Sequence, residues 1–153
     1  MELKIGFGSG TQKLTVPDEY VMDVLHANSV ETGLTGQEEV RRALAAPIGT
    51  PRLREIVKPG EKIAVITSDI TRPMPTYKVM PAILEELSAA GVRDEDVTLV
   101  FALGSHRPMT EEERRKLAGP ETFERIRCIN GDPSDCVRMG ITSRGTPVDI
   151  VVL

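Results

Sequence analysis

The stretch "SDITRPMP" at residues 68–75 crowds an acid, a hydroxyl and a guanidinium directly after an apolar run. Arg72 offers a planar fork that can hold a carboxylate through two hydrogen bonds. Asp69 can accept hydrogen bonds from ribose hydroxyls or hold an arginine in place, and Thr71 adds a hydroxyl group. The alternative task for Asp69 and Thr71 is to cap a following helix. Taken together, these side chains favour a site for an anionic, oxygen-rich ligand.

A second polar stretch, "GSHRPMT" at residues 104–110, follows the next apolar run and contains His106 and Arg107. Histidine titrates close to neutrality, so it can take up a proton and return it. His106 is therefore the candidate catalytic acid–base, and a hydrogen bond to a backbone carbonyl is its alternative role. Gly104 lets the backbone approach a ligand closely.

The elements between these stretches predict that the two meet in space. The apolar runs "EKIAVITSD" (61–69) and "DVTLVFALG" (96–104) are typical of buried strands, and residues 75–91 between them have a helical pattern interrupted by Pro81. Strand, helix and strand form a right-handed βαβ unit with parallel strands. Both polar stretches then leave the sheet at its carboxyl edge, where open α/β sheets bind ligands. Pro81 predicts a kink or a later helix start.

Hairpins are predicted at both ends of the chain. Residues 3–17 alternate around a Gly-Ser-Gly turn, and residues 136–153 form two strand patterns around Ser-Arg-Gly. A further strand is expected near residues 127–130. The predicted fold class is α/β, a βαβ-based parallel sheet with added β-hairpins at both ends, in one domain that spans residues 1–153.

Capping signals predict where three helices begin. Thr35 with Glu38 and Thr110 with Glu113 stand at the spacing of a capping box, each before a helical pattern. Thr50 is the expected N-cap of a short helix between them. These helices complete the α/β pattern.

Composition excludes several classes of function. The net charge of −4 and the absence of Trp argue against nucleic-acid binding. No apolar run approaches the ~20 residues that span a membrane, and the start of the chain lacks the apolar core of a signal peptide, so we expect a cytoplasmic protein. Cys128 and Cys136 have no zinc-type spacing, and no residue is predicted to bind a metal.

The sequence resembles the N-terminal region of the nickel-dependent lactate racemase family. The resemblance rests on "PIGTPRLREIVKPGEKIAVITSDITRPMP" (47–75) followed by "FALGSHRPMTEEE" (101–113), and extends over most of the chain. It implies an isomerase, a racemase or epimerase with two α/β domains and a nickel pincer nucleotide (a pyridinium bisthiocarboxylate mononucleotide) between them. The implied reaction inverts a 2-hydroxy acid such as lactate by proton-coupled hydride transfer to the pyridinium.

The resemblance also assigns roles to residues. His106 matches a family histidine that moves the hydroxyl proton, Arg72 matches the arginine that orients the substrate carboxylate, and Asp69 and Thr71 lie in the motif that contacts the cofactor. The family's second catalytic histidine, its covalently bound lysine and its nickel-ligating histidine have no match in this chain, and His26 lies in the wrong segment.

Because these groups are missing, we expect this chain to carry only half of an active site. We expect this chain to be the N-terminal portion of a longer two-domain protein. Its expected partner is the remaining C-terminal portion of the family's chain. Alone, the N-terminal portion should neither turn over substrate nor bind nickel stably. The alternative is a non-catalytic nucleotide- or carboxylate-binding module. A scaffold that pairs with another subunit is a third possibility.

Overall fold

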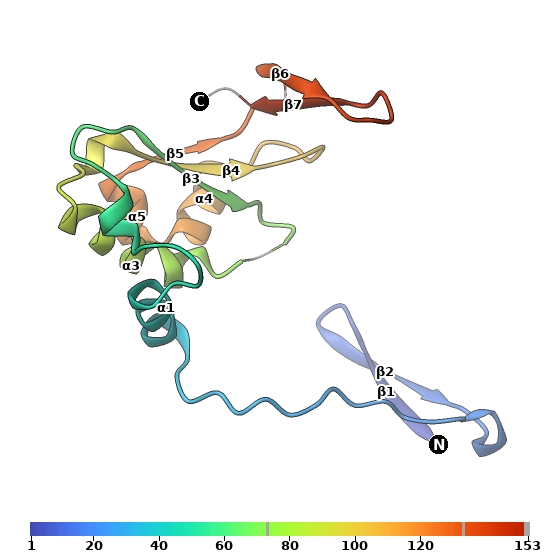
Figure 1. The fold of residues 1–153 in the computed structure, drawn as a ribbon. Helices are drawn as coiled ribbons and strands as arrows, with labels where there is room; N and C mark the ends of the chain where they lie inside the picture. The colour runs from blue at the N-terminus through green and yellow to red at the C-terminus, as the bar shows by residue number, and fades with distance from the viewer. Residues whose placement is uncertain (73, 133, 152–153) are drawn as a thin grey trace. The chain divides into compact units, whose positions relative to one another are not determined.

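The computed structural model describes residues 1–72, 74–132 and 134–151. The chain divides into two compact units, Met1–Gly33 and Leu34–Leu153 (Figure 1). The expectation of a single domain for the whole chain stays a prediction.

The N-terminal unit contains a two-stranded antiparallel hairpin. Strands β1 (Glu2–Phe7) and β2 (Gly10–Thr15) pair in continuous register, and a single 3₁₀ turn, η1 (Asp18–Tyr20), follows. Gly8 adopts φ 58° in the connecting turn, a left-handed conformation that glycine reaches without steric cost. The predicted first hairpin is confirmed.

The second unit contains a three-stranded parallel sheet in the order β3-β4-β5. Its strands are β3 (Ile63–Ser68), β4 (Val97–Ala102) and β5 (Arg127–Asn130). β3 and β4 pair in register along their whole length, and Ser68 lies opposite Ala102 at their carboxyl ends. The predicted parallel βαβ arrangement is therefore confirmed, and the loops that leave β3 and β4 begin side by side.

Helices of this unit pack on the sheet and form the core with it. Figure 1 shows α3, α4 and α5 together on one side of the strands. Leu84 of α3 and Leu99 and Phe101 of β4 are almost fully buried at the centre of the apolar cluster. The helices are α1 (Gly36–Ala45), α2 (Leu53–Ile56), α3 (Thr76–Ala89), α4 (Glu111–Ala118) and α5 (Pro120–Arg125), with a 3₁₀ turn η2 (Asp94–Asp96) before β4.

Of the three predicted helix caps, one is confirmed and two are wrong. Thr110 and Glu113 form the predicted capping box: Glu113 N–H donates to Thr110 Oγ1 (3.2 Å), and Thr110 N–H donates to Glu113 Oε2 (2.9 Å). Helix α1 begins directly after Thr35 as expected, but the Thr35 side chain makes no capping hydrogen bond. The short helix α2 is capped by Arg52, not Thr50.

Of the two outcomes expected at Pro81, the late helix start is wrong, and the kink stays a prediction. Helix α3 runs without a break from Thr76 to Ala89 and includes Pro81. Met80 and Leu84, on either side of this proline, are each 1% exposed. We attribute the continuity to this packing, which offsets the backbone hydrogen bond that proline removes.

A second hairpin closes the chain, as predicted. Strands β6 (Cys136–Ile141) and β7 (Pro147–Val151) pair antiparallel, with an irregularity in register between Arg138 and Gly140. The last two residues of the predicted strand, 152 and 153, lie outside the described residues. In the part of the chain that the structure describes, no helix is long and apolar enough to cross a membrane.

Candidate functional site

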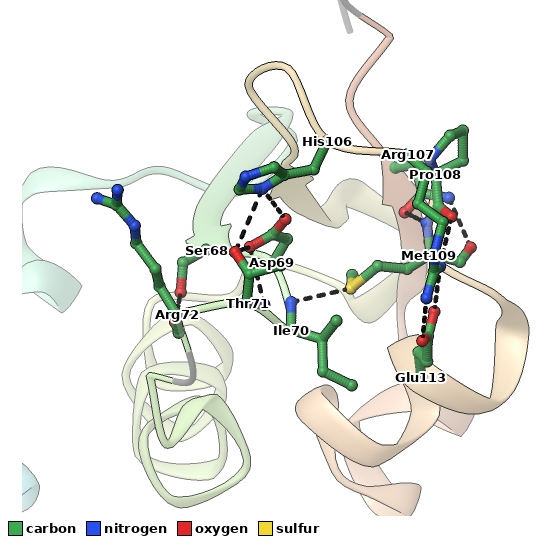
Figure 2. A network of polar contacts seen from close by, with 11 residues as sticks. Ser68, Asp69, Ile70, Thr71, Arg72, His106, Arg107, Pro108, Met109 and Glu113 are labelled. Atoms are coloured by element: carbon green, nitrogen blue, oxygen red, sulfur yellow. Dashed lines mark hydrogen bonds and ion pairs between the residues drawn. The ribbon is translucent and has the colours of Figure 1, made fainter. Parts of the chain in front are cut away.

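Two loops meet at the carboxyl edge of the parallel sheet (Figure 2). One follows β3 and carries Asp69, Thr71 and Arg72; the other follows β4 and carries His106. Gly104 turns the second loop with φ 58°, and the His106 N–H donates to the Leu103 carbonyl (3.0 Å). The side chains of Asp69, Thr71 and His106 are therefore brought into contact, whereas no contact joins the Arg72 side chain to His106 among the described residues, from which Pro73 is left out.

The Asp69 carboxylate is the buried centre of this site, with only 4% of the residue exposed. Its Oδ1 accepts hydrogen bonds from the Thr71 hydroxyl (2.7 Å) and the Thr71 N–H (3.1 Å), and its Oδ2 lies 2.6 Å from His106 Nδ1. The Thr71 hydroxyl, and after it the His106 imidazole, holds the pKa of Asp69 below its usual value against the opposing effect of burial. Asp69 is thus an ionised hydrogen-bond acceptor at neutral pH, and its hydrogen-bond partner from the second loop is His106.

This contact fixes the orientation of the His106 ring. An ionised carboxylate can only accept, so the hydrogen-bond network assigns the proton of the neutral ring to Nδ1. Nδ1 also lies 3.2 Å from the Thr71 hydroxyl oxygen. The His106 side chain is 46% exposed, and Nε2, which makes no hydrogen bond within the described part of the chain, carries the lone pair. The structure therefore leaves a proton acceptor at an accessible position.

The Arg72 guanidinium has no partner among the residues that the structure describes. Its backbone is held, because the Ser68 hydroxyl donates to the Arg72 carbonyl (2.6 Å) and the Arg72 N–H donates to the Asp69 carbonyl (3.3 Å). The exposed side chain makes no hydrogen bond or ion pair with any residue that the structure describes, and Figure 2 shows it extending away from Met109. A fixed backbone with an unpaired guanidinium suits the binding of an external carboxylate.

Arg107 is committed to a different contact. Its guanidinium donates two hydrogen bonds to the Glu113 carboxylate, at 2.8 and 2.7 Å. This pairing, with the backbone N–H of Thr110, lowers the pKa of Glu113 to about 2. Arg107 therefore ties the His106 loop to the start of α4 and is not available as a second anion-binding group.

Sequence reasoning missed two residues that support the site. The Met109 sulfur accepts a hydrogen bond from the Ile70 N–H (3.3 Å). The Asn130 side chain pairs with both backbone groups of Met109. Asn130 is the last residue of β5, so the rule that placed Asp69 and His106 at the carboxyl edge could also have placed Asn130 there.

The described residues offer no complete metal site. They contain no group of three or more His, Cys, Asp or Glu side chains that could hold an ion. Burial raises the pKa of the Cys128 thiol to about 11, which disfavours the thiolate that a metal needs. The pair of His106 and Asp69 falls short of the ligand number that a stable transition-metal site requires.

Known proteins with similar sequences are lactate racemases. The chain is 30% identical over 139 residues to the lactate racemase of Thermoanaerobacterium thermosaccharolyticum, which covers 90% of this chain and 32% of that protein. It is 32% identical over 120 residues to the lactate racemase of Lactiplantibacillus plantarum, which covers 76% of this chain and 28% of that protein. The chain spans about a third of the length of these relatives.

A solved structure agrees with the sequence matches. The lactate racemase apoprotein of T. thermosaccharolyticum superposes with a TM-score of 0.81 at 26% identity, over 99% of this chain and 36% of that one. The model of the lactate racemase N-terminal domain matches residues 7–153. The resemblance read from the two polar motifs is confirmed: the chain belongs to the lactate racemase N-terminal domain family.

Proposed function

We propose that this chain supplies the proton-transferring and carboxylate-binding half of a racemase or epimerase that acts on a 2-hydroxy acid such as lactate. The observation that carries the proposal is the 2.6 Å contact between His106 Nδ1 and Asp69, which leaves the opposite ring nitrogen accessible. Family membership supports the substrate class. The proposal places the site in a protein that also contains the other two thirds of the racemase fold, in the same chain or in another.

In this proposal His106 is the acid–base. Nε2 accepts the proton of the substrate hydroxyl as the α-carbon is oxidised to the keto level, and it returns that proton when the hydroxyl group re-forms. Asp69 keeps the ring in the required tautomer and stabilises the imidazolium that forms after proton transfer. Asp69 itself is buried, so the acceptor side of this contact is shielded from water, while the His106 ring stays accessible.

Arg72 binds the substrate carboxylate. A bidentate pair between the guanidinium and a carboxylate fixes the orientation of a small acid as well as its position. Since the substrate carries its hydroxyl on the carbon next to the carboxylate, anchoring one group places the other at a fixed distance. Arg72 and His106 thereby act on the two ends of the same small molecule.

The nickel pincer nucleotide that the resemblance implies does not fit this chain alone. The described residues lack a metal-ligand set, and the Asp69 oxygens, assigned to the cofactor together with Thr71, already accept three hydrogen bonds from Thr71 and His106. Amino-acid side chains cannot store a hydride. We therefore propose that the isolated chain has no racemase activity and that the hydride acceptor is held by the rest of the racemase fold.

A chimera tests the proposal. This chain would replace the N-terminal domain of the T. thermosaccharolyticum lactate racemase, and conversion between D- and L-lactate would be measured with the parent enzyme beside it. We expect turnover that His106→Gln abolishes and that Arg72→Gln weakens through a higher KM. Arg107→Gln is the matched control, because Arg107 is paired with Glu113 and should leave KM unchanged.

Two results would contradict the proposal. One is a folded, cofactor-loaded chimera that interconverts none of a panel of 2-hydroxy acids. The other is an equal effect of Arg72→Gln and Arg107→Gln on KM. The second candidate function is a non-catalytic binding module. Calorimetry with the isolated chain distinguishes it from the racemase portion, because measurable binding of lactate or a mononucleotide without the rest of the fold indicates a binding module.

A further inference from the structure

We propose that Asn130, acting through Met109, is the positioning residue that holds the His106 loop against Asp69. The inference rests on the proposed role of His106 in proton transfer, and it concerns residues to which neither the sequence motifs nor the family resemblance assigns a role. It is carried by a continuous set of contacts from β5 to both site loops.

The Asn130 side-chain amide makes two hydrogen bonds to the backbone of Met109. Its Nδ2 donates to the Met109 carbonyl (2.9 Å), and its Oδ1 accepts from the Met109 N–H (3.3 Å). A primary amide has one donor end and one acceptor end, so it can satisfy both groups in only one orientation. Asn130 itself is held by β5, whose pairing with β4 places it opposite Phe101. The anchor point therefore belongs to the rigid sheet.

Met109 in turn contacts the loop that follows β3 and carries Asp69. The residue is 4% exposed and belongs to the apolar core. Its sulfur lies 3.3 Å from the backbone nitrogen of Ile70, which directly follows Asp69. A thioether is a weak acceptor, so the tight packing of Met109 contributes more than the hydrogen bond. Met109 thus contacts the loop that carries Asp69 and, three residues after His106, ends the loop that carries the imidazole.

The site needs such an anchor because its central contact is short and partly exposed. Hydrogen bonds weaken steeply with distance, and a displacement of about 1 Å removes the advantage of a preorganised group. The His106 loop is held at its start by the bond from His106 N–H to Leu103. Beyond His106, the Arg107–Glu113 pair is exposed on the arginine side, and such pairs stabilise weakly. Asn130 supplies the buried anchor at the far end.

The test uses nuclear magnetic resonance on the 153-residue chain. Asn130→Asp keeps the shape of the side chain but turns an oxygen toward the Met109 carbonyl in place of the donor. We expect the pKa of Asp69, followed through its carboxyl ¹³C signal, to rise toward the usual value, and the ring ¹⁵N shifts of His106 to change from one tautomer to a mixture. Met109→Leu, which removes the sulfur at similar volume, should shift both signals in the same direction by less.

Cys128→Ala is the matched control, because Cys128 lies on the same strand, packs against the core and makes no hydrogen bond to Met109. The inference is overturned if Asn130→Asp and Met109→Leu lower stability as Cys128→Ala does but leave both signals of the site unchanged. Neither readout involves turnover, so an inactive chimera would leave this inference standing, and unchanged signals would leave the proposed function standing.

Discussion

Replacing Glu86 by glutamine tests how α2 is fastened to α3, the helix that begins just after the Arg72 loop. The Glu86 side chain is 6% exposed and accepts hydrogen bonds from Arg52 Nη2 (2.6 Å) and from Arg54 Nε (2.9 Å), with a further contact to Arg54. These arginines, Arg54 first, lower the pKa of Glu86 from 4.5 to about 2. The carboxylate is therefore charged and paired at every pH above the acid range.

The pKa of Glu86 sets the size of the expected effect. A carboxyl pKa of about 2 in place of 4.5 corresponds to at most about 3 kcal/mol of folding free energy. The Arg52 and Arg54 side chains are 32% and 40% exposed, and solvent screening reduces the contribution to about 1–2 kcal/mol. Glu86→Gln should lower the free energy of unfolding by that amount at neutral pH.

Urea denaturation as a function of pH provides the assay. The folded-state pKa of Glu86 is depressed, so its contribution is fully present above about pH 4.5 and is lost as the pH falls toward about 2. The difference in unfolding free energy between wild type and Glu86→Gln should therefore shrink across this window. Glu85→Gln is the control, because its side chain is 53% exposed and paired with Arg41 on the surface. A difference that stays constant with pH, or an equal loss in Glu85→Gln, would refute the reasoning.

Three further predictions concern the site and its supports. Asp69→Asn should lower the kcat of the chimeric racemase by about 10²-fold or more with a smaller change in KM, because the acceptor that fixes the His106 tautomer is weakened; equal changes in both constants would count against it. Thr110→Ala should cost about 1 kcal/mol in chemical denaturation by removing the α4 cap, whereas Thr110→Ser should cost little. Phe101→Ala should cost about 3–5 kcal/mol, since Phe101 is fully buried, and a loss below about 1 kcal/mol would contradict the assigned core.

The arrangement of the site loops was predictable because it follows from chain topology. Two apolar strands joined by a helix are parallel, and their carboxyl ends share an edge. The proximity of Asp69 and His106, which are 37 residues apart, could therefore be predicted without information about side-chain packing. The Thr110–Glu113 capping box was equally accessible, since both partners lie within one turn of the chain.

The pairings between side chains could not be predicted from the sequence. Asp69 could have held an arginine or a ribose; its contact with His106 depends on loop conformations that local patterns do not determine. The anchoring of Met109 by Asn130 joins segments 21 residues apart and depends on the placement of β5. Helix α2 illustrates the same limit, because tertiary contacts of Arg52 with Glu86 accompany a start later than the Thr50 signal.

The paired ends of β3 and β4 determine which changes in length the site tolerates. Each strand residue advances the chain by about 3.3 Å and reverses the face to which its side chain points. One residue inserted within the six of β4 would therefore move His106 out of reach of Asp69. The segment between Ala89 and Val97 lies at the opposite, amino end of β4, and its Val92 and Asp96 are buried. A change of length there should therefore affect stability before it affects the contact between His106 and Asp69.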